Sequence, residues 1–264
     1  MMPLSLSTIA RAVNGRLIGN DLVVGTLVTD TRKLEANASV PALFIAIKGE
    51  NFDGNDYVAK AAELGARAAL VSRQSDAAIP QIVVADTERA LADLALVAQR
   101  DRRTKVVAIT GSNGKTSVKT LTQAIFERAG STYATPGNRN NEIGMPLAVL
   151  DTPEDAAFAI YEMGTGKPGD IAYLTRIAPP DIALVNNIAP AHMENAKSTA
   201  AWYDFICDKL DRMVDLNGAY RSKLLNSAIP RASAASYHCF ALALDLDDDL
   251  SPPHEQLSDY ELAK

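Results

Sequence analysis

The sequence predicts an α/β protein with a mainly parallel sheet in its second part, and three observations support this fold class. Short apolar runs alternate with segments of helical period from about residue 43 to residue 186. The apolar runs are continuous rather than alternating, which is typical of strands that are buried on both faces. Polar motifs follow several of these runs directly, and parallel sheets bind their ligands at the carboxyl ends of their strands.

In the first hundred residues, the apolar runs are short enough to be strands and the segments around them have a helical period. The stretch Arg100–Lys105 (RDRRTK) then interrupts the apolar pattern, either as a linker between domains or as the solvated end of a helix. We expect strands at Leu43–Ile47, Ala68–Val71 and Ile82–Val84, and helices at Tyr57–Leu64 and Thr87–Gln99.

After residue 105 the strand–helix alternation becomes more regular. Val106–Thr110 (VVAIT) is a buried-strand run, and a glycine-rich turn follows it. We expect a helix at about Lys115–Ala129, strands at Ala157–Met163 and Ile182–Asn186, and a helix near Asp170–Arg176. Repeated strand–helix–strand units of this kind predict right-handed crossovers and a parallel sheet.

Charge and composition exclude several classes of protein. The chain has 264 residues, 26 basic and 32 acidic side chains, and a net charge of −6. The segment 245–264 carries this whole excess, and an acidic chain without a basic face argues against nucleic-acid binding. No apolar run reaches the roughly 18 residues of a membrane span. The start shows no secretory signal, and Cys207 and Cys239 lack metal-site spacing, so we expect a cytoplasmic protein.

The turn Gly111-Ser112-Asn113-Gly114-Lys115-Thr116, which Ser117 follows, has the residue types of a phosphate-binding loop. Glycines let several backbone N–H groups point at one anion, and the helix N-terminus adds partial positive charge. A lysine here reaches the β- and γ-phosphates, and the threonine hydroxyl binds Mg²⁺. The usual pattern has four residues between the first glycine and Gly-Lys, whereas Gly111 stands two positions closer to Gly114-Lys115 than that pattern requires. The alternative is a simple strand–turn–helix corner.

This loop and several other segments resemble the Mur ligase family of ATP-dependent amide-bond ligases in cell-wall synthesis. The resemblance extends from residue 1 to about residue 195 and is closest to the members that add D-alanyl-D-alanine to UDP-N-acetylmuramoyl-tripeptide. The segments that carry it are TGSNGKT, Thr135–Pro146 (TPGNRNNEIGMP), Tyr161–Gly164 (YEMG), Val185–Glu194 (VNNIAPAHME), Val28–Arg32 (VTDTR) and Leu43–Gly54 (LFIAIKGENFDG). At Asn55, histidine is usual in the family.

The resemblance implies ATP and Mg²⁺, an acyl-phosphate intermediate, and roles for individual residues. It implies catalytic roles for Lys115, Asn138 and His192, and nucleotide binding by Gly111–Ser117. It implies metal binding by Thr116, Glu162 and His192, and substrate binding by Asp30, Thr31, Arg32, Lys48, Gly49, Asn140 and Asn141. Without the resemblance, other interpretations stay open. Glu162 could form a salt bridge to a nearby Lys or Arg, and the asparagines could make turns.

The resemblance also implies a domain organisation. We expect a UDP-sugar-binding α/β domain at 1–102, an incomplete P-loop ATPase domain at 103–205 with a mainly parallel sheet, and a divergent tail at 206–264. Residues 198–216 have the pattern of an amphipathic packing helix. The loss of resemblance after about residue 195 suggests a shortened or frame-shifted ligase. The alternatives are a fragment that only binds ATP or UDP-sugar, a sister Mur ligase, and a folylpolyglutamate synthase-like enzyme.

Overall fold

The computed structural model describes residues 3–36, 38–49, 51–167 and 169–186, which form two compact units. The N-terminal unit contains Met1–Thr104, Glu142–Ala157 and Arg176–Ala178. The phosphate-loop unit contains Lys105–Asn141, Phe158–Thr175 and the chain from Pro179. The segment from Glu142 to Ala157 therefore returns to the N-terminal unit. His192, the expected helix at 198–216 and the expected tail lie outside the described residues.

A five-stranded sheet of order β2-β7-β6-β5-β4 forms the centre of the N-terminal unit. Its strands β4 to β7 are parallel, and β2 is antiparallel to β7 at one edge. The strands are β2 (Arg16–Ile18), β4 (Thr26–Val28), β5 (Ala42–Ile45), β6 (Ala66–Val71) and β7 (Gln81–Val83). A separate antiparallel pair consists of β1 (Leu4–Ser5) and β3 (Val23–Val24).

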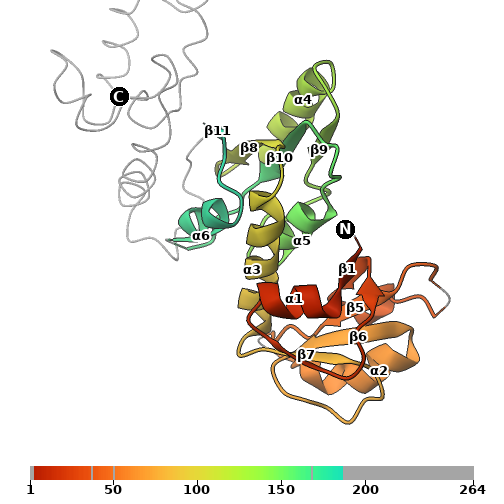
Figure 1. Ribbon diagram of the computed structural model, residues 1–264. Coiled ribbons are helices and arrows are strands. Elements are labelled where there is room, and N and C mark those ends of the chain that lie inside the picture. The colour runs from red at the N-terminus through yellow and green to blue at the C-terminus, as the bar shows by residue number, and fades with distance from the viewer. Residues whose placement is uncertain (1–2, 37, 50, 168, 187–264) are drawn as a thin grey trace, which may run out of the picture. The chain divides into compact units, whose positions relative to one another are not determined.

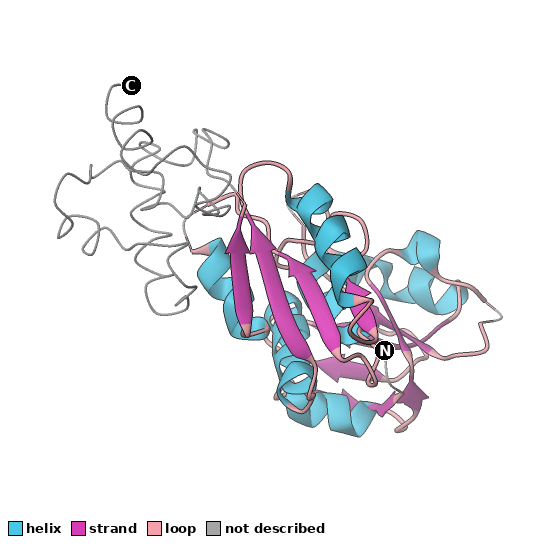
Figure 2. Cartoon of the chain, turned by 90° about the horizontal axis from the view of Figure 1, so that it is seen from above, coloured by secondary structure: helices cyan, strands magenta, loops and turns pink. Residues whose placement is uncertain are grey.

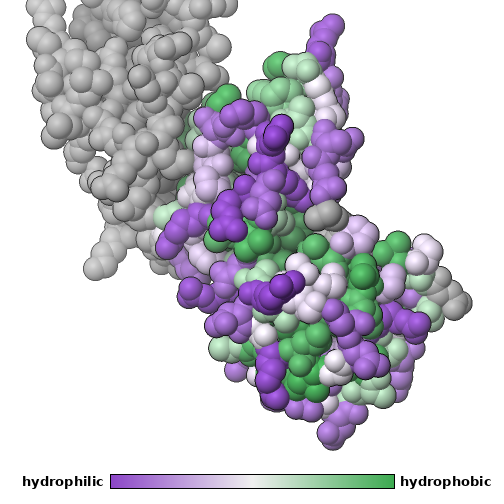
Figure 3. Space-filling model, viewed as in Figure 1, coloured by the Kyte–Doolittle hydropathy of each residue, from purple (hydrophilic) through white to green (hydrophobic). Residues whose placement is uncertain are grey.

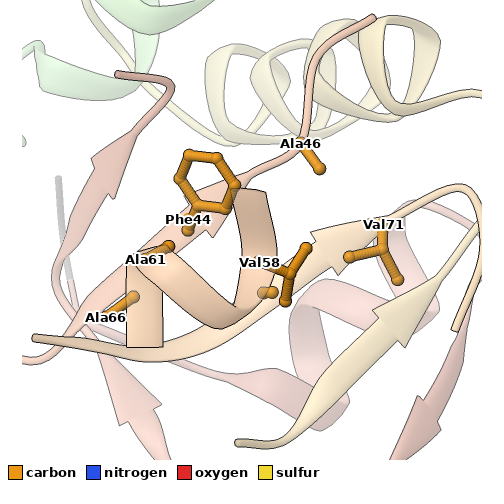
Figure 4. Packing of buried hydrophobic residues seen from close by; sticks show 7 residues of the cluster. Phe44, Ala46, Val58, Ala61, Ala66 and Val71 are labelled. Atoms are coloured by element: carbon orange, nitrogen blue, oxygen red, sulfur yellow. The ribbon is translucent and has the colours of Figure 1, made fainter. Parts of the chain in front are cut away.

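Continuous apolar strands bury both faces of this sheet. Phe44 and Val71 pack with Val58 and Ala61 of helix α2 (Val58–Glu63) on one face, and Figure 4 shows these side chains gathered around the helix. Successive strand residues point to opposite faces, so the neighbouring residue Leu43 lies on the other face of the sheet. Leu43 is also fully buried, which shows that this second face is covered too. Burial of such side chains stabilises the unit by about 1.5–3 kcal/mol each.

Helix boundaries in the N-terminal unit follow side-chain caps. Ser5 accepts from the Thr8 N–H at the start of α1 (Leu6–Ala12), and Asp86 accepts from the Glu88 N–H at the start of α3 (Thr87–Arg100). Helix α5 (Gly144–Asp151) is almost entirely buried and packs against α3. Because α5 is apolar on all sides, it has little helical period, and the sequence pattern did not reveal it.

The phosphate-loop unit contains a four-stranded parallel sheet of order β11-β8-β10-β9. Figure 2 shows its strands running in one direction beside their helices. The strands are β8 (Lys105–Thr110), β9 (Thr132–Ala134), β10 (Phe158–Glu162) and β11 (Ile182–Val185). Helix α4 (Lys115–Phe126) packs against β8, β9 and β10, and α6 (Asp170–Ile177) precedes β11.

The apolar side of α4 and the centre of the sheet form the core of this unit. Val107, Ile109 and Ile160 are buried, with Val118 packed against them. The rings of Phe126 and Phe158 meet edge to face, with their centroids 4.8 Å apart. This packing fixes the first turn of α4 over the carboxyl ends of β8 and β10, where the expected motifs lie.

The expected α/β class and the expected mainly parallel sheet after residue 103 are confirmed, and the element bounds differ from the expected ones in detail. The expected helix at 57–64 is a 3₁₀ turn, η2 (Gly54–Tyr57), followed by α2. The expected helix at 115–129 ends at Phe126. Only residues 101–104 of the charged stretch lie outside a helix or strand, because α3 includes Arg100 and β8 begins at Lys105.

Hydrophilic and hydrophobic residues are interspersed on the surface of the described part of the chain. In the view of Figure 3, hydrophilic residues project from the described part of the chain and hydrophobic residues lie between them. Figure 1 traces the elements from the N-terminus to β11. Among the described residues, no helix has the length and apolar character that crossing a membrane requires.

Candidate phosphate-binding and catalytic site

The glycine-rich loop connects the end of β8 to the start of α4, as the motif predicts. Gly111 and Gly114 have φ values of 138° and 74°, which glycine adopts without strain. Gly114 immediately precedes the first residue of α4, so the loop leads directly into the electropositive helix N-terminus. At the end of β8, the Thr110 hydroxyl is buried without a hydrogen-bond partner among the described residues.

Asn186, the residue that follows β11, closes one side of the loop. Its backbone N–H donates to the Thr110 carbonyl at 2.9 Å, and its Nδ2 donates to the Asn113 carbonyl at 2.6 Å. A Cβ atom at Gly114 would lie 2.7 Å from the same Nδ2. Asn186 belongs to the segment VNNIAPAHME, in which the sequence predicts a site role only for His192. The contact between Asn186 and the loop is therefore not predicted from the sequence.

The half-buried Lys115 folds back onto its own loop. Its Nζ donates to the Gly111 carbonyl at 2.6 Å. This position keeps a positive charge beside the glycine-rich backbone, where an anion would bind. Ser117 is exposed in the first turn of α4, and Ser112 and Asn113 lie in the loop itself.

Glu162, at the end of β10, is the acidic centre of the site. The residue is only 2% exposed. Its Oε2 accepts from the Thr116 hydroxyl at 3.1 Å, and its Oε1 accepts from Asn140 Nδ2 at 2.8 Å. The structure therefore brings together Thr116, Glu162 and Asn140, all of which the sequence selected.

Lys119, for which the sequence pattern predicts no role, also contacts Glu162. Its Nζ lies 3.0 Å from Glu162 Oε2 and donates to the Gly137 carbonyl at 2.8 Å. Burial alone would raise the pKa of Glu162, but hydrogen bonds from Asn140 and Lys119, the Lys119 charge and the Thr116 hydroxyl together lower that pKa. The salt bridge considered from the sequence is therefore present, and it exists together with the Thr116 contact.

The loop that carries the three asparagines is fixed through its backbone. Gly164 N–H donates to the Asn140 carbonyl at 2.7 Å, and a Cβ atom at Gly164 would lie 2.9 Å from Asn140 Oδ1. Thr135 Oγ1 accepts from the Glu162 N–H at 3.0 Å. Asn138 and Asn141 are exposed, and Asn140 donates to Glu162.

The residues present fit a magnesium ion by the chemistry of their donors. The Thr116 hydroxyl and the Glu162 carboxylate are both oxygen ligands, and they already contact each other. Among the described residues, no group of three His, Cys, Asp or Glu side chains could hold a metal. Mg²⁺ usually takes one or two protein ligands together with water and substrate phosphate oxygens.

The expected substrate residues of the N-terminal unit lie at the ends of β4 and β5. Asp30 caps the 3₁₀ turn η1 (Thr31–Lys33) and forms a bidentate pair with Arg32, whose Nη2 lies 2.7 Å from Asp30 Oδ2. The Arg32 hydrogen bonds lower the pKa of Asp30 to about 2. Beyond β5, Lys48 pairs with Asp53 in a β-bridge, and Gly49 N–H donates to the Phe52 carbonyl at 2.9 Å.

A glycine-rich loop between a parallel strand and a helix, with a carboxylate at the end of the adjacent strand, is the arrangement of the P-loop class of proteins. The description "Mur ligase family, catalytic domain" matches residues 28–109, and "Mur ligase middle domain" matches residues 109–206. The chain belongs to the Mur ligase family.

The chain is similar to named members of this family. It is 42% identical to the UDP-N-acetylmuramoyl-tripeptide–D-alanyl-D-alanine ligase of Escherichia coli over 76% of this chain and 43% of that protein. The corresponding Bacillus subtilis ligase is 38% identical over 75% of this chain and 44% of that protein. The chain thus spans less than half the length of these relatives.

Solved structures agree with this assignment. MurF from Acinetobacter baumannii superposes with a TM-score of 0.75 at 30% identity, over 81% of this chain and 48% of that one. The MurF ligase of Thermotoga maritima in complex with ADP superposes with a TM-score of 0.61 at 32% identity, over 68% of this chain and 41% of that one.

Proposed function

We propose that this chain acts as an ATP-dependent ligase that adds D-alanyl-D-alanine to UDP-N-acetylmuramoyl-tripeptide in the cytoplasm. The observation that carries the proposal is the direct contact between Thr116, in the first turn after the phosphate loop, and the buried Glu162. The names of the relatives at 38–42% identity support this choice of substrates. The two oxygen donors favour a magnesium–nucleotide complex at the same place.

In the proposed reaction, the terminal carboxylate of the tripeptide attacks the γ-phosphate of ATP, the bond from the γ-phosphorus to the bridging oxygen breaks, and an acyl phosphate and ADP form. The amine of D-alanyl-D-alanine then attacks the acyl carbon and releases inorganic phosphate. Lys115 would neutralise charge on the β- and γ-phosphates, and the loop N–H groups would bind them. Thr116 and Glu162 would hold Mg²⁺, which supplies charge neutralisation when bound. Because catalysis of this kind is mainly positioning, the fixed loop geometry matters more than covalent chemistry.

The remaining expected residues take their roles within the same proposal. Asn138, Asn140 and Asn141 would contact substrate or nucleotide, and His192 would bind metal. In the N-terminal unit, Asp30, Thr31, Arg32, Lys48 and Gly49 would bind the UDP-sugar. Arg32 suits a diphosphate because its planar guanidinium forms bidentate bonds, and its side chain is 87% exposed.

Phosphate release tests the proposal. The purified chain is mixed with ATP, Mg²⁺, UDP-N-acetylmuramoyl-tripeptide and D-alanyl-D-alanine, and each component is omitted in turn. Release that requires both the tripeptide and the dipeptide supports ligation. ADP binding in calorimetry without any phosphate release would contradict ligation by this chain and would support the alternative of a binding fragment.

A further inference from the structure

Lys119 and Glu162 form a buried ion pair beside the phosphate loop. Their side chains are only 6% and 2% exposed. Lysine and glutamate are almost never buried to this extent unless they are paired, because desolvation of each charge is costly. Packing alone therefore does not account for this ion pair. Its position beside the phosphate loop suggests a role in nucleotide binding.

Glu162 lies where a nucleotide would place its phosphates. Its Oε2 accepts from Thr116, the second residue of α4, and this helix begins directly after the phosphate loop. An ionised carboxylate in this position would repel a bound nucleotide, because both groups are negative and water is largely excluded around Glu162. A cation must neutralise that repulsion.

Lys119 is the cation that the chain itself supplies. It stands four residues after Lys115, so both lysines lie on one face of α4. Lys115 turns to the Gly111 carbonyl of the loop, whereas Lys119 contacts the same Glu162 oxygen that accepts from Thr116. The two lysines thus place one positive charge at the loop and one at the carboxylate.

We propose that Lys119 is a positioning residue and an internal counter-cation, which keeps the site able to accept nucleotide phosphates before a divalent cation neutralises Glu162. This inference rests on the proposed nucleotide binding. It requires that the loss of Lys119 weakens nucleotide binding most when Mg²⁺ is absent. A purely structural role, in which Lys119 only ties α4 to the Gly137 carbonyl, would make Lys119 equally important with and without Mg²⁺.

Calorimetry with ADP separates the two roles. ADP binding is measured in EDTA and again in excess MgCl₂ for the unaltered chain and for Lys119→Met, Lys119→Arg and Glu162→Gln. Lys105→Met is the matched control, since Lys105 is an exposed lysine that pairs with Asp181 at the opposite end of β8. Thermal unfolding of each variant reports on its folding.

The proposal expects Lys119→Met to weaken ADP binding at least tenfold in EDTA and less than threefold in MgCl₂. Lys119→Arg should recover most of the affinity in EDTA, and Lys105→Met should change neither value. Glu162→Gln removes the repelling charge, so it should bind ADP in EDTA at least as tightly as the unaltered chain. This variant keeps the test decisive if Lys119→Met does not fold.

Two results would overturn the proposal. One is an equal loss of affinity in EDTA and MgCl₂ for Lys119→Met, which is the signature of a structural role. The other is weaker ADP binding in EDTA by Glu162→Gln. If the unaltered chain binds no ADP in either buffer, the proposed function itself fails, and that outcome is distinct from both.

Discussion

Asn186 Nδ2 lies 2.6 Å from the Asn113 carbonyl oxygen and joins the end of β11 to the phosphate loop. Because β11 is the neighbour of β8 in the sheet, the loop is held both by the strand it follows and by the adjacent one. This contact explains why the fourth loop residue is glycine: any side chain there would displace the Asn186 amide.

We expect Gly114→Ala to weaken ADP binding at least tenfold. Alanine would have to adopt a φ near 74°, which costs about 1–2 kcal/mol, and its Cβ would lie 2.7 Å from Asn186 Nδ2. Gly169→Ala is the control, because Gly169 also has a positive φ but a Cβ there would meet nothing within 4 Å. Calorimetry with ADP measures the difference, and equal effects of the two variants would contradict the crowding argument.

We expect Thr116→Val to raise the Mg²⁺ concentration needed for half-maximal phosphate release about tenfold. Valine keeps the volume of threonine but removes the hydroxyl that donates to Glu162 Oε2 and that would bind the metal. Thr116→Ser keeps the hydroxyl and should behave like the unaltered chain. A magnesium titration of both variants checks this, and the idea fails if valine and serine give the same curve.

Much of this site could be predicted from the sequence because its parts are local. The residues from Gly111 to Thr116 are consecutive, and Glu162 ends an apolar strand, so each can be recognised in a short window. Lys119 and Asn186 could not be assigned in the same way. Their partners are Glu162 and Asn113, which are far away in sequence and meet only through the order of β11, β8 and β10.

The fold shows the same division between local and long-range information. Strands such as β5 and β8 are continuous apolar runs, so their existence was predicted and only their ends differ by a few residues. Strands β2, β3 and β4 contain two or three residues, too few for a period. Helix α5 is found only through its packing against α3, which no local pattern encodes.

We expect the pKa of the Asp30 carboxyl, which is about 2 in the intact chain, to be higher in Arg32→Ala, where only the backbone N–H of residue 32 still donates to it. The Arg32 side-chain hydrogen bonds lower the pKa of Asp30. Since the pKa of Asp30 is lowered on folding, the stability that the pair contributes is present above about pH 4 and is lost as the pH falls toward 2. Carboxyl chemical shifts measure the titration, with Arg67→Ala as a control. An unchanged midpoint in Arg32→Ala would refute the assigned cause.

Asn55 is buried in the N-terminal unit, and both ends of its side-chain amide form hydrogen bonds. Its Nδ2 donates to Asp53 Oδ1 at 2.6 Å and to Ser72 Oγ at 2.9 Å, and its Oδ1 accepts from the Ser72 N–H at 3.0 Å. Donor and acceptor are thus both used, and the side chain joins the turn after β5 to the end of β6. We expect Asn55→Ala to lower the free energy of unfolding by about 1–3 kcal/mol, because it leaves polar groups without partners.

Asn55→Asp tests the donor separately from the shape of the side chain. A carboxylate at this position would face Asp53 Oδ1 where Asn55 Nδ2 now donates at 2.6 Å, so the pKa of the new carboxyl should rise on folding. A raised pKa means that the folded state binds more protons, and the stability deficit of Asn55→Asp should therefore grow between pH 4 and pH 7. The Asn55→Ala deficit should change little above pH 5, because it removes the Asn55 hydrogen bond that lowers the pKa of Asp53 and this effect depends on pH only near 4 and below. Urea unfolding at several pH values checks both variants, and parallel curves would show that the Asp53 contact contributes no repulsion.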